Sequence, residues 1–141
     1  MAYALDGDIL GLDLGTVRTG VARIHTVAQI AEPLAPIQMS EAFTSDVKKL
    51  VADYKPSAVV VGMPRGLDAQ TTTQTLWVQE VYKSLQDSLP VPVFTIDEAG
   101  TTKQAQTQAT SGQSVDSVAA CIFLEDFVRA ASRGGIEDVS L

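Results

Sequence analysis

The distribution of apolar residues along the chain predicts five strands and three helices. Short apolar stretches are typical of strands, and they cover residues 9–14, 19–25, 31–38, 58–62 and 91–96. Apolar residues three and four positions apart predict helices over residues 40–54, 73–89 and 115–131. Hairpin-linked strands followed by strand–helix crossovers indicate an α/β fold, a mixed five-stranded sheet with helices on both faces.

Two segments add detail to this pattern. Pro33 and Pro36 cannot donate hydrogen bonds to a ladder, so the third strand is predicted to be an edge strand or an irregular one. The tail from about residue 133 is expected to fray. The buried stripe of the last helix is predicted to consist of Val118, Ala119, Ile122, Phe123 and Phe127.

Asp13 places a charge inside the apolar run of the first strand. A buried carboxylate costs several kcal/mol unless it is paired or binds a cation, so Asp13 is the first functional candidate. Gly15 and Thr16 predict a turn that folds the second strand back beside the first. The alternative is a structural role, in which Asp13 accepts hydrogen bonds from the backbone amides of that turn.

Two further carboxylate positions fall at the ends of predicted elements. Asp97 and Glu98 follow the fifth strand, and Asp116 lies at the start of the last helix. Successive strand residues point to opposite faces, so only one of Asp97 and Glu98 is expected to face the same side as Asp13. Three oxygen ligands suit Mg²⁺ or Mn²⁺, and two such ions about 4 Å apart can activate water against a phosphodiester. For Asp116 alone, stabilisation by the helix dipole is an equally good explanation.

Composition limits the classes of protein to consider. A chain of 141 residues is expected to form a single domain. It has no apolar run near 18 residues and no secretory signal at its start, so a cytoplasmic location without a membrane span is expected. Cys121 and His25 are the only residues of their types, which excludes an internal disulfide and a cysteine–histidine zinc site. Cys121 is expected in the core and His25 in a structural or exposed strand position.

The formal net charge of −7 is unfavourable for binding a polyanion, although bound metal ions would offset it. Arg18 falls in the predicted hairpin turn near Asp13, and Arg65 follows the fourth strand. The hydroxyls of Thr71 and Thr72 precede a helix N-terminus that could hold a phosphate. These four residues are the candidate substrate contacts; the alternative is an ordinary surface loop capped by threonine.

Four sequence blocks, in order, resemble the signature blocks of the YqgF/RuvX family. They are Gly11-Leu-Asp-Leu-Gly-Thr with Gly20-Val-Ala, Val59-Val-Val-Gly-Met-Pro64, Asp97-Glu98 with Thr101-Thr102, and Val115-Asp-Ser-Val-Ala-Ala120. The family comprises pre-16S rRNA nucleases, also described as Holliday junction resolvase-like, with an RNase H-like fold. The resemblance implies a hydrolase whose metal-binding catalytic residues are Asp13, Glu98 and Asp116, and so favours Glu98 over Asp97. It also implies two Mg²⁺ or Mn²⁺ ions and processing of precursor rRNA near the 5′ end of 16S rRNA in ribosome biogenesis.

The chain departs from the family pattern at two places. Ala99-Gly100 replaces the arginine that usually follows the Asp-Glu pair, and the segment 103–114 is short and poor in basic residues. A catalytically inactive member that binds RNA or protein is therefore the main alternative. A Holliday junction resolvase acting on structured DNA is another, and it would need a homodimer rather than a monomer. The first block is also similar to the phosphate loop of actin-like ATPases, but the chain is too short for their second lobe.

Overall fold

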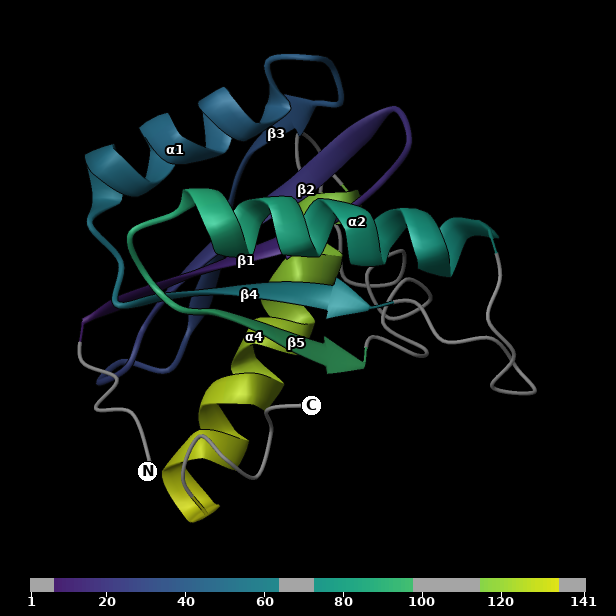
Figure 1. Cartoon of the computed structure of the whole chain (residues 1–141). Coiled ribbons are helices and arrows are strands. Elements are labelled where there is room, and N and C mark those ends of the chain that lie inside the picture. Colours follow the sequence, from purple (N-terminus) through teal and green to yellow (C-terminus); the bar gives the residue numbers. More distant parts are fainter. Residues whose placement is uncertain (1–6, 64–72, 98–114, 135–141) are drawn as a thin grey trace.

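The computed structural model describes residues 7–63, 73–97 and 115–134 (Figure 1). Its five strands form one sheet in the order β3-β2-β1-β4-β5, in which β1 is antiparallel to β2 and parallel to β4, and β4 is parallel to β5. The strands are β1 (Asp8–Asp13), β2 (Arg18–His25), β3 (Ala31–Gln38), β4 (Ala58–Met63) and β5 (Val93–Asp97). The helices are α1 (Phe43–Tyr54), α2 (Thr73–Ser88) and α4 (Val115–Gly134). The predicted mixed five-stranded sheet is confirmed.

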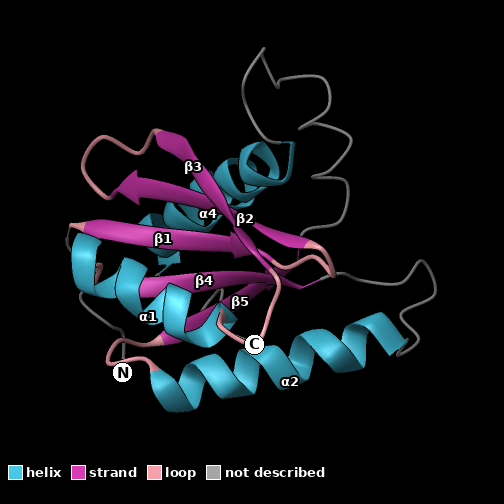
Figure 2. Cartoon of the chain, turned by 90° about the horizontal axis from the view of Figure 1, so that it is seen from above, coloured by secondary structure: helices cyan, strands magenta, loops and turns pink. Residues whose placement is uncertain are grey.

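Helices cover both faces of this sheet, as Figure 2 shows. On one face α4 packs against Ile9, Ala22 and Val60, and on the other α1 and α2 pack against Leu12 and Val61. Alternate residues of each strand serve the two cores, so the apolar runs of β1 and β4 reflect burial on both sides. Within the described parts of the chain, no helix has the length and apolar character that a membrane span requires.

Several element boundaries differ from the sequence prediction, mostly by one residue, and three of them differ for identifiable reasons. Helix α1 begins at Phe43 rather than residue 40, because Ser40 forms a turn in which its side chain accepts a hydrogen bond from the Ala42 amide. Strand β5 begins at Val93, since Pro92 has no amide hydrogen to donate. Helix α4 continues to Gly134, into the segment predicted to fray; the rest of that tail lies outside the described residues.

The predicted stripe of α4 is buried but incomplete. Phe123 and Phe127 face the sheet together with Ala120 and Leu124, which the prediction omitted. The predicted residues Val118 and Ala119 are buried in a separate small cluster, against which the partly buried Ile122 packs. Gly11 explains the difference, because a strand position without a side chain lets the helix approach the sheet at Ala120 and Leu124.

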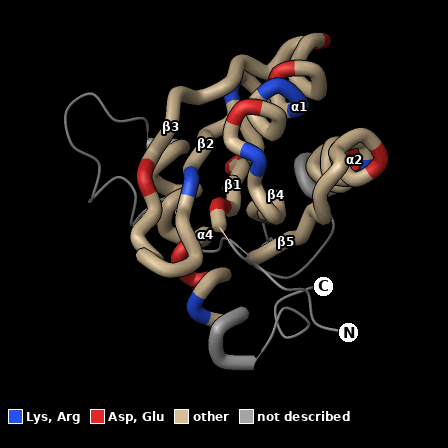
Figure 3. The backbone as a smooth tube through the Cα atoms, turned by 90° about the vertical axis from the view of Figure 1, so that its left-hand side faces the viewer, with Lys and Arg blue, Asp and Glu red and all other residues tan. Residues whose placement is uncertain are grey.

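Strand β3 is an edge strand, as its two prolines predicted. Arg23 of β2 helps to hold it: its guanidinium lies 2.7 Å from Glu32 of β3 and 3.9 Å from Asp8 of β1. These oppositely charged segments of β2 and β3 lie side by side in Figure 3. The same guanidinium lies 5.3 Å from the ring centre of Tyr54, which ties the end of α1 to the sheet.

Candidate active site

Asp13 is the last residue of β1. It lies at the carboxyl-terminal end of the parallel strands β1, β4 and β5. Its exposed fraction is only 9%. Its register partners are Gly20 on β2 and Gly62 on β4. Because both partners are glycine, no cross-strand side chain lies beside the carboxylate. In most strand pairs the partner residue does place a side chain there. The prediction of a buried carboxylate at the exit of the first strand is confirmed.

The carboxylate of Asp13 lies on the face of the sheet that α4 covers. Ile9 belongs to the α4 core, and a side chain built at Gly11 would lie 3.5 Å from the carbonyl oxygen of Ala120 in α4. Strand residues two apart share a face, so Ile9, Gly11 and Asp13 point to the same side. The first turns of α4 and the end of β1 thus border one site.

Ser117 fixes the beginning of α4 to the sheet. Its buried hydroxyl accepts a hydrogen bond from the Val21 amide at 3.0 Å and donates one to the Leu34 carbonyl at 2.9 Å. Val21 and Leu34 are register partners on β2 and β3, so the hydroxyl bridges two strands. The sequence reasoning missed this residue. Its one available signal was a polar side chain in the first turn of a helix whose next residues are apolar.

The β1–β2 turn brings Arg18 to the same end of the sheet. Arg18 is the first residue of β2 and is exposed. A side chain at Gly15 would lie 2.3 Å from the Arg18 carbonyl oxygen, so the turn requires glycine there. The predicted place of Arg18, in the hairpin near Asp13, agrees with this geometry.

The structure describes only part of the predicted site. Asp97 is the last residue of β5, and Asp116 is the second residue of α4, with its side chain outside the described residues. Four predicted positions also lie outside them: Glu98, Arg65, Thr71 and Thr72. Among the residues that are described, no three His, Cys, Asp or Glu side chains form a metal-binding group. The chemistry of Asp13, a hard oxygen donor at a buried strand end, fits a divalent cation.

Cys121 and His25 have the structural roles that the sequence predicted. Cys121 is buried in the α4 core, where burial and, to a smaller extent, the carboxylates of Glu125 and Glu32 raise the pKa of its thiol to about 12. A thiol with such a pKa stays protonated at neutral pH and is a poor nucleophile. His25 is the exposed last residue of β2, and its Nδ1 accepts a hydrogen bond from the Val27 amide.

Comparison with known proteins gives a consistent picture. The profile of a family described as "RuvX: Holliday junction resolvase" matches residues 7–130. Proteins named "Putative pre-16S rRNA nuclease" are similar in sequence. The one from Mycoplasma mobile is 30% identical over 84% of this chain and 90% of its own. The one from Thiobacillus denitrificans is 32% identical over 88% of this chain and 92% of its own.

Solved structures agree on the fold. The chain of T. thermophilus RuvC in complex with a Holliday junction substrate has a TM-score of 0.65 at 15% identity, over 95% of this chain and 99% of that one. The fowlpox virus resolvase in its complex with Holliday junction DNA has a TM-score of 0.52 at 10% identity, over 84% and 97% of the two chains. The RNase H-like fold is confirmed.

Proposed function

The chain belongs to the RuvX family, and from this premise we propose that it is a metal-dependent nuclease that processes the 5′ end of pre-16S rRNA. The names of its relatives support precursor rRNA as the substrate class. A hydrolase of this kind would act in the cytoplasm during ribosome biogenesis, as a single domain formed by residues 1–141. The observation that carries the proposal is the buried carboxylate of Asp13 at the end of β1, between two glycines and opposite the start of α4.

Asp116 is proposed as the second metal ligand. In an α-helix, residues four apart lie on one face, so position 116 lies one turn before Ala120. Ala120 packs where α4 meets Gly11, two residues before Asp13. The hydrogen bond from Val21 to Ser117 supports the same juxtaposition, since Val21 follows Gly20, the register partner of Asp13.

Glu98 is proposed as the third ligand. Phe94 and Ile96 of β5 pack in the core that α4 covers, while Val93 packs in the opposite core. Even-numbered positions of this strand therefore share the face of Asp13, and Glu98 is the next even-numbered position. Strand β4 lies between β1 and β5, so the ordinary strand spacing puts β5 about 10 Å from β1. Carboxylates that point toward each other, with metal ions bound between them, can bridge this distance.

One or two Mg²⁺ or Mn²⁺ ions held by these carboxylates would supply an activated water and stabilise the leaving oxygen of the phosphodiester. The residues of the chain have separate tasks. Asp13, Glu98 and Asp116 would hold the cations, whose positive charge would compensate the three carboxylates. Arg18 is proposed to contact a substrate phosphate at the β1–β2 turn. Arg65, Thr71 and Thr72 are proposed to contact the RNA backbone from the segment that follows β4.

Cleavage of a labelled precursor RNA that spans the 5′ end of 16S rRNA tests the proposal. We expect cleavage with Mg²⁺ or Mn²⁺ and none with EDTA, and a loss of at least about a hundredfold in Asp13→Asn. Asp8→Asn is the matched control, because Asp8 lies at the other end of the same strand. Circular dichroism checks that both variants are folded, and Mn²⁺ should raise the melting temperature of the wild type and of Asp8→Asn only.

Two results would overturn the mechanism: full activity of folded Asp13→Asn, or cleavage without metal. If the wild-type protein instead binds the precursor RNA tightly and never cleaves it, the chain is a binding module. Ala99-Gly100, in place of the family arginine, is the feature that favours this second candidate.

A further inference from the structure

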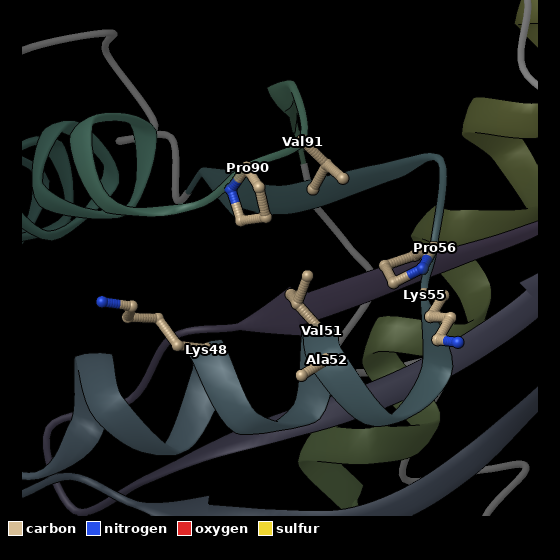
Figure 4. Close-up of a pocket in the computed structure, with 7 residues that line it drawn as sticks. All are labelled: Lys48, Val51, Ala52, Lys55, Pro56, Pro90 and Val91. Atoms are coloured by element: carbon tan, nitrogen blue, oxygen red, sulfur yellow. The ribbon is translucent and has the colours of Figure 1, made fainter.

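A groove with a volume of about 450 Å³ opens between the end of α1 and the segment that joins α2 to β5. In Figure 4, Val51 projects from α1 toward Pro90 and Val91, with Lys48 toward one end of the groove and Lys55 toward the other. Ala52 and Pro56 complete the lining. We call this surface the α1 groove.

The lining residues of α1 follow a single helical stripe. Lys48, Val51 and Ala52 stand at positions i, i+3 and i+4 of α1, which share one face of the helix, and Lys55 directly follows the last residue of the helix. Val51 is 4% exposed and forms the floor, whereas the two lysines are exposed. A rise of 1.5 Å per residue puts the lysines about 10 Å apart along the helix axis. The groove is therefore an apolar strip with a positive charge toward each end.

Both positive charges are available to a partner. The ion pairs between described residues involve Arg23 and Arg129 and neither of these lysines. Lys55 also has a φ of +50°, a left-handed conformation in which glycine is the usual residue. Lysine is less favourable than glycine at this backbone position. Two lysines that form no ion pair with the described residues thus flank one apolar groove, in a chain of net charge −7.

We propose that the α1 groove docks an acidic amphipathic helix of a partner protein. Two carboxylates seven positions apart on that helix would face Lys48 and Lys55, and the apolar residues between them would cover Val51 and Val91. A protein partner is favoured over nucleic acid because none of the described lining residues is aromatic, so a base has no ring to stack on. Recognition would follow the helix-in-groove mode, with charge setting the register.

The groove and the carboxylate site lie at opposite ends of the sheet. Pro56 of the groove comes two residues before Ala58, the first residue of β4, and Gly62 of the same strand pairs with Asp13. Gly62 lies four positions after Ala58 along the strand, a distance of about 13 Å. A docked helix would leave the end of β1 open, so the proposal does not depend on the nuclease activity.

The test uses a fluorescein-labelled synthetic helix with glutamates at i and i+7 and leucines at i+3 and i+4. We expect its fluorescence anisotropy to rise on adding the full-length protein. Lys48→Glu/Lys55→Glu should weaken binding about tenfold or more, because two attractions become two repulsions. Lys49→Glu is the matched control: Lys49 is exposed on the same helix but does not line the groove. A probe with lysines in place of its glutamates should bind the double variant better than the wild type.

Several outcomes would overturn the proposal. They are the absence of binding at millimolar protein, equal weakening by Lys49→Glu, or no recovery with the charge-reversed probe. A monomer–dimer equilibrium that the double variant abolishes in sedimentation would assign the groove to a second copy of this chain instead. A loss of RNA binding in the double variant, with unchanged binding of the helical probe, would assign the lysines to nucleic acid.

Discussion

The hydroxyl of Ser117 accepts a hydrogen bond from the backbone amide of Val21, a residue 96 positions earlier in the sequence. It does so where the β2–β3 ladder changes register: Thr19 pairs with Ile37 and Val21 with Leu34, so the step on β3 is one residue longer than on β2. The hydroxyl also donates a hydrogen bond to the Leu34 carbonyl and so links both strands to α4 at this point. These two hydrogen bonds hold the first turn of α4 beside β2 and β3, one residue from Gly20, the register partner of Asp13.

Ser117→Ala should therefore affect both stability and metal binding. One buried and one partly buried backbone group lose their partner, which is expected to lower the free energy of unfolding by about 1–3 kcal/mol. The first turn of α4 then loses its anchor, and we expect the Mn²⁺ concentration for half-maximal cleavage to rise by about tenfold. Urea unfolding and a Mn²⁺ titration of the cleavage rate measure the two effects.

A matched variant separates positioning from general stability. Val128→Ala removes buried methyl groups near the other end of α4 and should cost about 1–3 kcal/mol without changing the Mn²⁺ midpoint. Ser117→Thr, which keeps the hydroxyl, should recover most of the Mn²⁺ affinity. A normal Mn²⁺ midpoint in folded Ser117→Ala would show that this hydroxyl has only a structural role.

Gly11 sets the distance between β1 and α4. A methyl group there would lie 3.2 Å from Leu124 Cδ2 and 3.3 Å from Phe123 Cε1, so Gly11→Ala is expected to lower the free energy of unfolding by about 1–2 kcal/mol. Leu124→Ala opens a cavity at the same point. In the Leu124→Ala protein, Gly11→Ala should lower the free energy of unfolding clearly less than it does in the wild type, since the new methyl group fills part of the cavity. Additive free energies in the double variant, from urea unfolding, would contradict this close contact.

The sequence predicted the sheet well because each strand alternates between two separate cores, which leaves apolar runs that are visible without a structure. Two features could not be predicted from it. Ala120 and Leu124 were missing from the predicted stripe of α4, because they pack where Gly11 carries no side chain and a helix pattern alone does not show where the opposite surface is hollow. The Ser117 bridge depends on the register of β3, which tertiary packing sets over a long sequence separation. Asp13 was predictable because one charge contradicted its local apolar pattern.

The buried thiol of Cys121 makes stability depend on alkaline pH. Its pKa rises from 9.0 to about 12 on folding, because burial and the nearby Glu125 and Glu32 disfavour the thiolate. Between those values the unfolded chain releases a proton that the folded protein retains, so stability falls as pH rises, by at most about 1.4 kcal/mol per pH unit. Cys121→Ala lacks this contribution. Its free energy of unfolding relative to the wild type should therefore improve steadily from pH 8.5 to pH 10.5; a constant difference would contradict the shifted pKa.

Ala99→Arg tests whether missing positive charge limits substrate binding. Ala99 directly follows the Asp97-Glu98 pair, where the family usually has an arginine. Because a phosphate contact releases one more counterion, the slope of log affinity against log salt concentration should steepen by roughly 0.7 for single-stranded RNA. A contact with a phosphate other than the reacting one binds substrate and transition state alike, so for such a contact we expect KM for precursor RNA to fall several-fold at low salt while kcat stays within about twofold. Ala99→Gln is the control, because glutamine has a long polar side chain like arginine but carries no charge. If arginine instead raises kcat and leaves the salt slope unchanged, this position acts on the reacting phosphate rather than on RNA binding.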